Sequence, residues 1–184
     1  MTILTELHQD HVNLNKLLVI LRQKVDQLRE GLHPNFNLIA DVIEYIASYA
    51  DGFHHPREDK LYQYLADRSG VLDQKLFNCA KEHEMLKASS LHLREALDGI
   101  LHDSVMPMDE FANLLDEFVA LQTNHLNFEE GELFPMIEEL ISESEMALLE
   151  NKLPAPEDPL FGEKRAHEYT DLYKELIIDL NEAS

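Results

Sequence analysis

The sequence predicts an all-α protein: an up-down-up-down four-helix bundle with an additional short helix and a C-terminal helix packed on the outside. Apolar residues recur at steps of three and four over four long segments, residues 2–30, 37–67, 72–101 and 108–141, which is the period of a helix with one buried face. Glycine and proline are few, six and seven among 184 residues, and cluster at a few places. Long helices joined by short turns are antiparallel neighbours in a bundle.

The first and third segments carry apolar stripes that each contain one histidine. The first stripe consists of Leu4, Leu7, His11, Leu14, Leu18, Leu21, Val25 and Leu28. The third consists of Leu76, Cys79, His83, Leu86, Ser90, Leu93 and Leu97. A polar side chain on an apolar face requires a partner, so His11 and His83 are candidates for a shared site.

The second and fourth segments each have an interior proline, Pro56 and Pro135. Such a proline removes a backbone N–H, bends the helix and costs about 3 kcal/mol. Pro56 comes two residues after His54, which suggests that local geometry there matters more than helix stability. The expected buried faces are Leu38, Val42, Tyr45, Ile46, Tyr49 and Phe53 in the second segment, and Phe111, Leu114, Leu115, Phe118, Leu121, His125, Phe128, Glu129 and Leu133 in the fourth.

The bundle is expected in residues 2–141 and the outer elements in residues 142–184. Ser142 and Glu145 form a capping-box pattern that predicts a short helix. A proline-rich strap follows, and a last amphipathic helix is expected over residues 163–182.

Length and charge limit the function classes. The chain is long enough for one domain, residues 1–184, with a sizeable core. Its net charge of -21, from 36 acidic and 15 basic residues, disfavours nucleic acid and anionic membranes as partners. The single cysteine, Cys79, excludes an intrachain disulfide. We expect a cytoplasmic protein, because the sequence has neither a signal-peptide pattern nor about 18 uninterrupted apolar residues; it does not predict the oligomeric state.

Four histidines are expected at one height in an antiparallel bundle. The midpoint of His11 and His54 is position 32.5. The midpoint of His54 and His83 is 68.5, and that of His83 and His125 is 104. All three positions fall in predicted turns, so the histidines should face one another, one from each helix.

An internal repeat adds two carboxylates to this set. The repeated pairs are Asp10-His11 with Glu82-His83, offset by 72, and His54-Glu58 with His125-Glu129, offset by 71. A residue and its fourth successor lie on one helix face. Four imidazoles and two carboxylates suit two adjacent transition-metal ions, each with about two imidazoles, terminal or bridging carboxylates and one open position. Without thiolate, this set favours iron, then manganese, with zinc as a further candidate.

The alternative interpretation is structural. A single inward histidine is more often a satisfied core or surface residue than a ligand, and a helical His-x-x-x-Glu is usually a surface pair worth a few tenths of a kcal/mol. Six polar groups at one depth of an apolar core differ, because leaving them unpaired costs several kcal/mol. We therefore favour a metal centre.

Neighbouring residues have weaker claims. His55 and Glu130 are expected to face water. Cys79, one turn before His83, is interpreted as a small buried filler rather than a thiol near the metal. One tyrosine is expected to donate a hydrogen bond or an electron if it lies near an iron site; the candidates are Tyr45, Tyr49, Tyr62, Tyr169 and Tyr173.

The segments 54–59 and 125–135, with the acidic residue that precedes the histidine in the first and third segments, resemble the signature blocks of the hemerythrin-like, HHE cation-binding domain family. The resemblance extends from His11 to the strap at 158–162. It implies an up-down four-helix bundle with two non-haem iron ions, Fe2+ or Fe3+, joined by an oxo or hydroxo bridge. The ligands that it implies are His11, His54, Glu58, His83, His125 and Glu129.

Two departures from the oxygen-carrying hemerythrins matter. Those proteins have a second histidine on the third helix, where this chain has Lys87. On the fourth helix they have an aspartate five residues after the histidine; here that residue is Glu130, and Glu129 stands at the four-residue spacing. The site is richer in carboxylate, which stabilises ferric iron and weakens the case for reversible O2 carriage.

Three functions follow as hypotheses. The first is a di-iron protein that binds O2 or a related small ligand, NO or peroxide. The second is an iron- or redox-responsive sensor or interaction module with a regulatory metal, whose contact region is the last helix together with the acidic surface. The third is a peroxide-consuming di-iron enzyme. No substrate-pocket residues argue for an enzyme, so no catalytic residue is assigned and the question of catalysis stays open.

Overall fold

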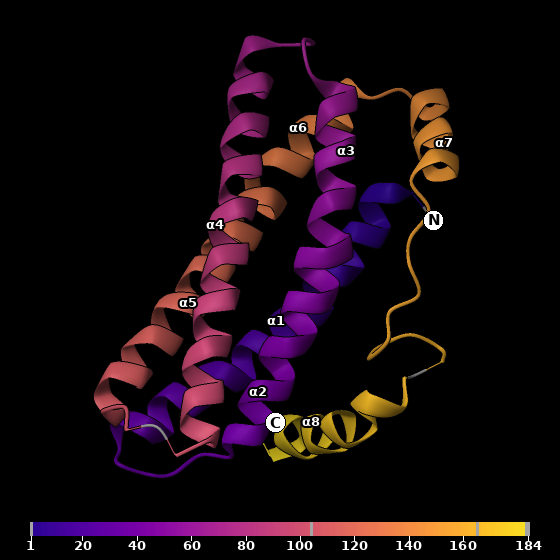
Figure 1. Cartoon of the computed structure of the whole chain (residues 1–184). Coiled ribbons are helices and arrows are strands. Elements are labelled where there is room, and N and C mark those ends of the chain that lie inside the picture. Colours follow the sequence, from indigo (N-terminus) through magenta and orange to yellow (C-terminus); the bar gives the residue numbers. More distant parts are fainter. Residues whose placement is uncertain (1, 104, 165, 183–184) are drawn as a thin grey trace.

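The structure, a computed structural model, describes residues 2–103, 105–164 and 166–182, and this part of the chain is all-α, as predicted (Figure 1). Four long rods form the bundle. The first is α1 (Ile3–Arg29) and the third is α4 (Gly70–Leu101). The second consists of α2 (Phe36–Tyr45), the π-helical segment η1 (Ile46–His54) and α3 (His55–Leu65), and the fourth of α5 (Met108–Phe128), the π-helical segment η2 (Glu129–Leu133) and α6 (Phe134–Leu140).

Residues with a left-handed backbone follow the first three rods. They are Gly31 with φ of 77°, Asp67 with φ of 66° and Asp103 with φ of 63°. Glycine has no steric cost in this conformation, and aspartate is among the residues that tolerate it. The rods therefore end at the three turns on which the spacing of the histidines depends.

A widened turn precedes each interior proline, where the sequence predicted a bend. η1 and η2 both end two residues before their proline, Pro56 and Pro135. In both, the amide next to the proline bonds to the carbonyl five residues earlier, as in a π-bulge. The extra residue in the widened turn rotates the helix so that Phe53 points outward. The prediction that Phe53 is buried is therefore wrong, because its side chain is 57% exposed. Leu121, also expected inside, is 38% exposed and lines a cavity that residues of α4 and α5 form together.

A polar layer divides the apolar core into two clusters. Along α1, Leu7 belongs to one cluster and Leu14 to the other, with His11 between them. α4 has the same order around His83. Packing above and below the layer thus holds the four rods in the register that brings their histidines together.

Two further helices lie outside the bundle. α7 (Glu143–Lys152) begins with the predicted capping box of Ser142 and Glu145. A short 3-10 turn, η3 (His167–Tyr169), leads into α8 (Thr170–Glu182), which lies across α1 and α2 (Figure 1). Within the described part of the chain, no helix is both long and apolar enough to cross a membrane. The cytoplasmic location stays a prediction.

Candidate metal centre

Six side chains from all four rods meet in the polar layer, and each exposes 4% of its surface or less. They are His11 on α1, His54 at the end of η1, Glu58 on α3, His83 on α4, His125 on α5 and Glu129 at the start of η2. We call His11, His54 and Glu58 the first half of the centre, and His83, His125 and Glu129 the second half.

In the first half, two imidazoles face each other beside a carboxylate. Nε2 of His11 lies 3.0 Å from Nε2 of His54. Oε1 of Glu58 lies 3.3 Å from Nε2 of His11 and 3.2 Å from Nε2 of His54. The other oxygen, Oε2, lies 3.4 Å from Nε2 of His83, so Glu58 spans the two halves.

Glu129 has the corresponding position in the second half. Its Oε2 lies 3.2 Å from Nε2 of His125 and 3.3 Å from Nε2 of His11. Its Oε1 lies 3.6 Å from Nε2 of His83. Both carboxylates therefore lie between the imidazole pairs, where they can serve two ions at once.

The outer nitrogen of each of the four imidazoles has a carboxylate partner. The Nδ1 pairs are His11 with Glu130 at 2.6 Å, His54 with Asp10 at 2.9 Å, His83 with Asp59 at 2.8 Å and His125 with Glu82 at 3.0 Å. Each acidic residue is the chain neighbour of a residue of the centre and binds a histidine on a different rod. An Nδ1–H that donates to a carboxylate fixes the tautomer and directs the Nε2 lone pair inward.

The inner atoms are poorly matched unless a cation lies among them. With their outer nitrogens protonated, His11 and His54 direct two Nε2 lone pairs at each other across 3.0 Å. Nε2 of His125, Oε2 of Glu129 and both oxygens of Glu58 are buried without a hydrogen bond, although they lie at ion-pair distances. Unpaired buried charge costs several kcal/mol. Imidazole with carboxylate is a donor set for transition-metal ions, so these residues fit a metal.

The pKa values show the same need for positive charge. Burial opposes protonation of His11, but its close contacts with three carboxylates, led by Glu129, outweigh burial and raise the pKa of His11 well above its usual range. Burial likewise acts to raise the pKa of Glu58, yet the charge of His54 and the close approach of three imidazoles hold that pKa well below its usual range. A cation held by these residues would supply this positive charge and leave the imidazoles neutral.

Comparison with known families agrees with this chemistry. The model of the hemerythrin HHE cation-binding domain matches residues 2–137. The chain belongs to this family. The family and the buried His and Glu clusters together indicate a cation-binding site. The match covers the four rods and ends within α6, before α7 and α8. No curated protein matches the sequence.

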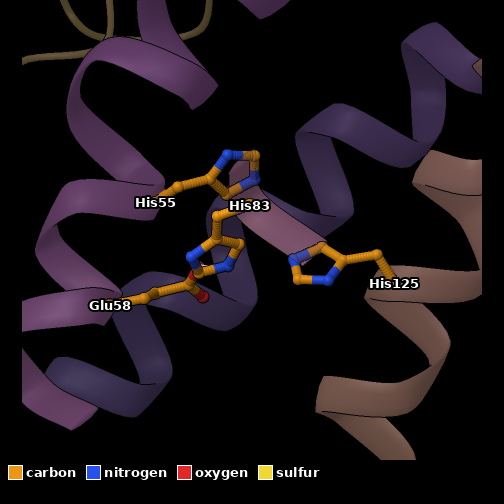
Figure 2. A group of neighbouring side chains, drawn as sticks. All are labelled: His55, Glu58, His83 and His125. Atoms are coloured by element: carbon orange, nitrogen blue, oxygen red, sulfur yellow. Dashed lines mark ion pairs between the residues drawn. The ribbon is translucent and has the colours of Figure 1, made fainter. Parts of the chain in front are cut away.

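This hemerythrin-family domain buries a fifth histidine beside the centre. His55 was expected to face water, which is wrong: it is 3% exposed. Its ring stacks on His83 with centroids 4.4 Å apart and meets His125 edge-on at 5.4 Å (Figure 2). The second rod packs against two other rods, so its buried face is wide enough to include two successive residues, which point about 100° apart on a helix. His54 faces α1 and His55 faces α4. Burial lowers the pKa of His55 to about 4, which leaves a neutral ring at neutral pH.

Glu130 was also expected to face water, and it does so only in part. Its side chain is 34% exposed, but its carboxylate binds Nδ1 of His11 and, at 2.9 Å, Nδ1 of His8. The outward tilt of Glu130 leaves its carboxylate within reach of α1. Lys87, in contrast, is exposed on α4 and adds nothing to the layer.

Two further donors contact the second half of the centre. Among the candidate tyrosines, Tyr62 reaches it: the hydroxyl donates to Oε1 of Glu129 at 2.5 Å. Cys79 is buried, as predicted, but it is more than a filler, because its thiol donates to the same oxygen at 2.9 Å and lies 3.9 Å from Nε2 of His83. Burial raises the pKa of Cys79, which keeps the thiol protonated as a donor.

Proposed function

We propose that the chain is a cytoplasmic non-haem di-iron protein that binds O2 or a related small ligand, NO or peroxide. The proposed metal ligands are His11, His54, Glu58, His83, His125 and Glu129. The observation that supports this most is the convergence of four Nε2 atoms and two spanning carboxylates in one buried layer. Bound iron supplies a redox-active Lewis acid for such ligands. The same donors admit manganese and zinc, so the choice of iron is part of the proposal.

The protein's own residues prepare the layer for two cations. The outer carboxylates hold the Nδ1 protons and keep the imidazoles aligned. Glu58 and Glu129 add two negative charges at the point shared by the halves, which favours the ferric state. Tyr62 and Cys79 donate to one oxygen of Glu129 and so moderate its charge. These features favour reaction with an oxidant over reversible oxygen storage.

The enclosure of the layer favours a small ligand. Its six residues are almost fully buried, and Phe134 stacks on His11 with centroids 5.2 Å apart. A cavity of about 290 Å³ lies against His125 and its carboxylate partner. A groove of about 780 Å³ lies beside Tyr62 and Asp59. Both are bordered by outer partners of the imidazoles, whereas the inner atoms are enclosed and suit a diatomic or similarly small molecule.

Metal analysis and spectroscopy test this proposal. Protein purified without a histidine tag and loaded with Fe2+ under anaerobic conditions should hold about two iron ions, one for each half. Oxygen should produce ferric charge-transfer absorption, and reversal on deoxygenation would separate carriage from oxidation. His54→Ala should reduce the iron content sharply, whereas His92→Ala, on the exposed face of α4, should not. A chain that holds no metal under these conditions contradicts the proposal.

One chain of contacts supports a second candidate, an iron- or redox-responsive sensor. Nδ1 of His54 donates to Asp10, which also accepts from the hydroxyl of Tyr49 at 3.2 Å. The ring of Tyr49 stacks on Tyr45 with centroids 5.5 Å apart, and the hydroxyl of Tyr45 donates to Asp158 at 2.9 Å. This path joins a proposed ligand to the strap that leads into α8.

Hydrogen exchange with and without iron distinguishes the two candidates. A sensor should show large changes in protection in the strap and α8, whereas a ligand-binding protein should change only near the centre. Tyr49→Phe interrupts the path and should abolish the remote change in a sensor. Steady turnover of hydrogen peroxide that is lost in His125→Ala would instead indicate the peroxide-consuming enzyme.

A further inference from the structure

His55 is a buried group beside the centre that the six proposed ligands do not include. It is the first residue of α3 and stacks on His83, whereas its neighbour His54 contacts His11. Figure 2 shows the ring of His55 beside those of His83 and His125, with Glu58 projecting from the same helix as His55. One donor atom from each of these four residues lies within 4.8 Å of the other three, a spacing that suits ligands around one ion.

The nitrogens of His55 lack the partners that a structural histidine has. Nδ1 lies 3.2 Å from Oδ1 of Asp51, an ion-pair distance, but without the alignment of a hydrogen bond. Nε2 has no hydrogen-bond partner, and neither carboxylate oxygen of Asp51 has one. An unpaired buried polar group is costly, so a further group is needed at Nε2.

Asp51 repeats the arrangement of the outer carboxylates. As at the four other imidazoles of the centre, a carboxylate lies against Nδ1 and leaves Nε2 as the donor to a metal. The equivalent of His55 in the internal repeat, 71 residues later, is Leu126. Leu126 is 6% exposed and belongs to the apolar core. An apolar side chain therefore suffices at the equivalent position, and packing alone does not explain an imidazole at position 55.

We propose that His55 is a third imidazole ligand of the metal ion in the second half, with Asp51 as the carboxylate that orients it. The inference rests on the proposed function, because it requires a metal at the centre. It gives one ion three imidazoles, from His55, His83 and His125, and leaves the other ion with two. The second rod thus supplies an imidazole that Lys87 does not supply from α4.

Titration of the metal-free, untagged chain with Co2+ tests the assignment, because the visible bands of Co2+ report both the number of ions and their ligands. The wild-type chain should bind about two Co2+ ions. His55→Leu introduces the residue of the equivalent position. This variant should lower the affinity for one of the two ions by about 100-fold, because loss of a residue that only orients a ligand already lowers metal affinity by about 10- to 100-fold. His55→Phe keeps an aromatic ring against His83 and should have the same effect.

Matched variants identify the ion and the role. The ion that binds less tightly in His55→Leu should be the same ion that binds less tightly in His83→Ala. Asp51→Asn should lower the affinity for this ion by about 10-fold. His92→Ala should change neither ion, and circular dichroism verifies that each variant is folded. If His55→Phe binds both ions with wild-type affinity, or if both ions weaken equally, the assignment is overturned while the di-iron proposal stands. If the wild-type chain binds no metal, the di-iron proposal itself fails.

Discussion

The two halves of the centre arise from one repeated sequence pattern but have different surroundings. In the first half, His11 stacks on the apolar ring of Phe134. In the second half, His83 stacks on another imidazole, that of His55, and a thiol and a phenol donate to Glu129. The inner residues are therefore nearly symmetric, but Glu129 has two hydrogen-bond donors whereas Glu58 has none among the described residues.

The repeat makes this difference explicit. Three residues that contact the second half correspond to leucines at offsets of 71 or 72. They are His55 with Leu126, Tyr62 with Leu133, and Cys79 with Leu7. All three leucines are buried in the apolar clusters. Because apolar residues satisfy the fold at the equivalent positions, the imidazole, phenol and thiol beside the second half support the proposed metal centre.

The largest expected effect comes from a residue that the halves share. Glu58→Ala should remove both ions, because its two oxygens face imidazoles of different halves, so the iron content should fall from about two ions to near zero. Iron analysis of the folded variant measures this. Glu129→Ala should behave alike. Retention of one full equivalent of iron in either variant would show that the carboxylate serves one half alone.

The second-largest expected effect is the loss of thermal stability when the metal is removed. A cation that binds only the folded chain stabilises it by about 2.7 kcal/mol per ion at a free concentration of 100 times Kd. Thermal unfolding with and without a chelator should therefore show a clearly lower Tm for the metal-free chain. In His55→Leu the gain from metal should be smaller, because one ion binds less tightly. An unchanged Tm in the wild-type chain would exclude tight binding at either half.

Single imidazoles should separate the halves. His11→Ala should lower the affinity for one ion and His83→Ala the affinity for the other, each by about 100-fold or more. Stepwise metal titration measures both affinities. Pairing either variant with His55→Leu sharpens the comparison. Adding His55→Leu to His11→Ala should lower the total metal affinity strongly, because the two substitutions affect different ions. Adding His55→Leu to His83→Ala should lower the total metal affinity only a little further, because both substitutions affect the same ion. The reverse order would place His55 in the first half.

Much of the centre is predictable from spacing because the helical period and the turn positions determine it. The stripe of α1 requires a regular helix, and the midpoints of the histidines require reversals at the three turns. The structure has both, and the π-helical segments of the second and fourth rods still leave the histidines in contact. The six inner residues follow from those two facts. The burial of His55 does not, because it depends on how far the second rod is rotated between two neighbours. A single sequence does not determine that rotation.

Other differences have local causes. The widened turns before Pro56 and Pro135 depend on which carbonyl accepts the bond from the preceding amide, and helix periodicity does not select it. α8 begins at Thr170 rather than near residue 163. Asp158 accepts from the amides of two following residues and holds the strap in a turn before the helix starts. These are side-chain contacts over short distances, which composition and periodicity do not predict.

The smallest expected effect is at Oε1 of Glu129, which has two donors. Tyr62→Phe leaves the thiol of Cys79 on this oxygen, and Cys79→Ala leaves the hydroxyl of Tyr62. Each single variant should therefore change metal affinity by about 1 kcal/mol or less, the typical worth of one hydrogen bond. The double variant should cost more than the sum, because the oxygen then has no donor. Additive losses would mean that the two donors act independently, and the second half would then resemble the first more closely than its contacts indicate.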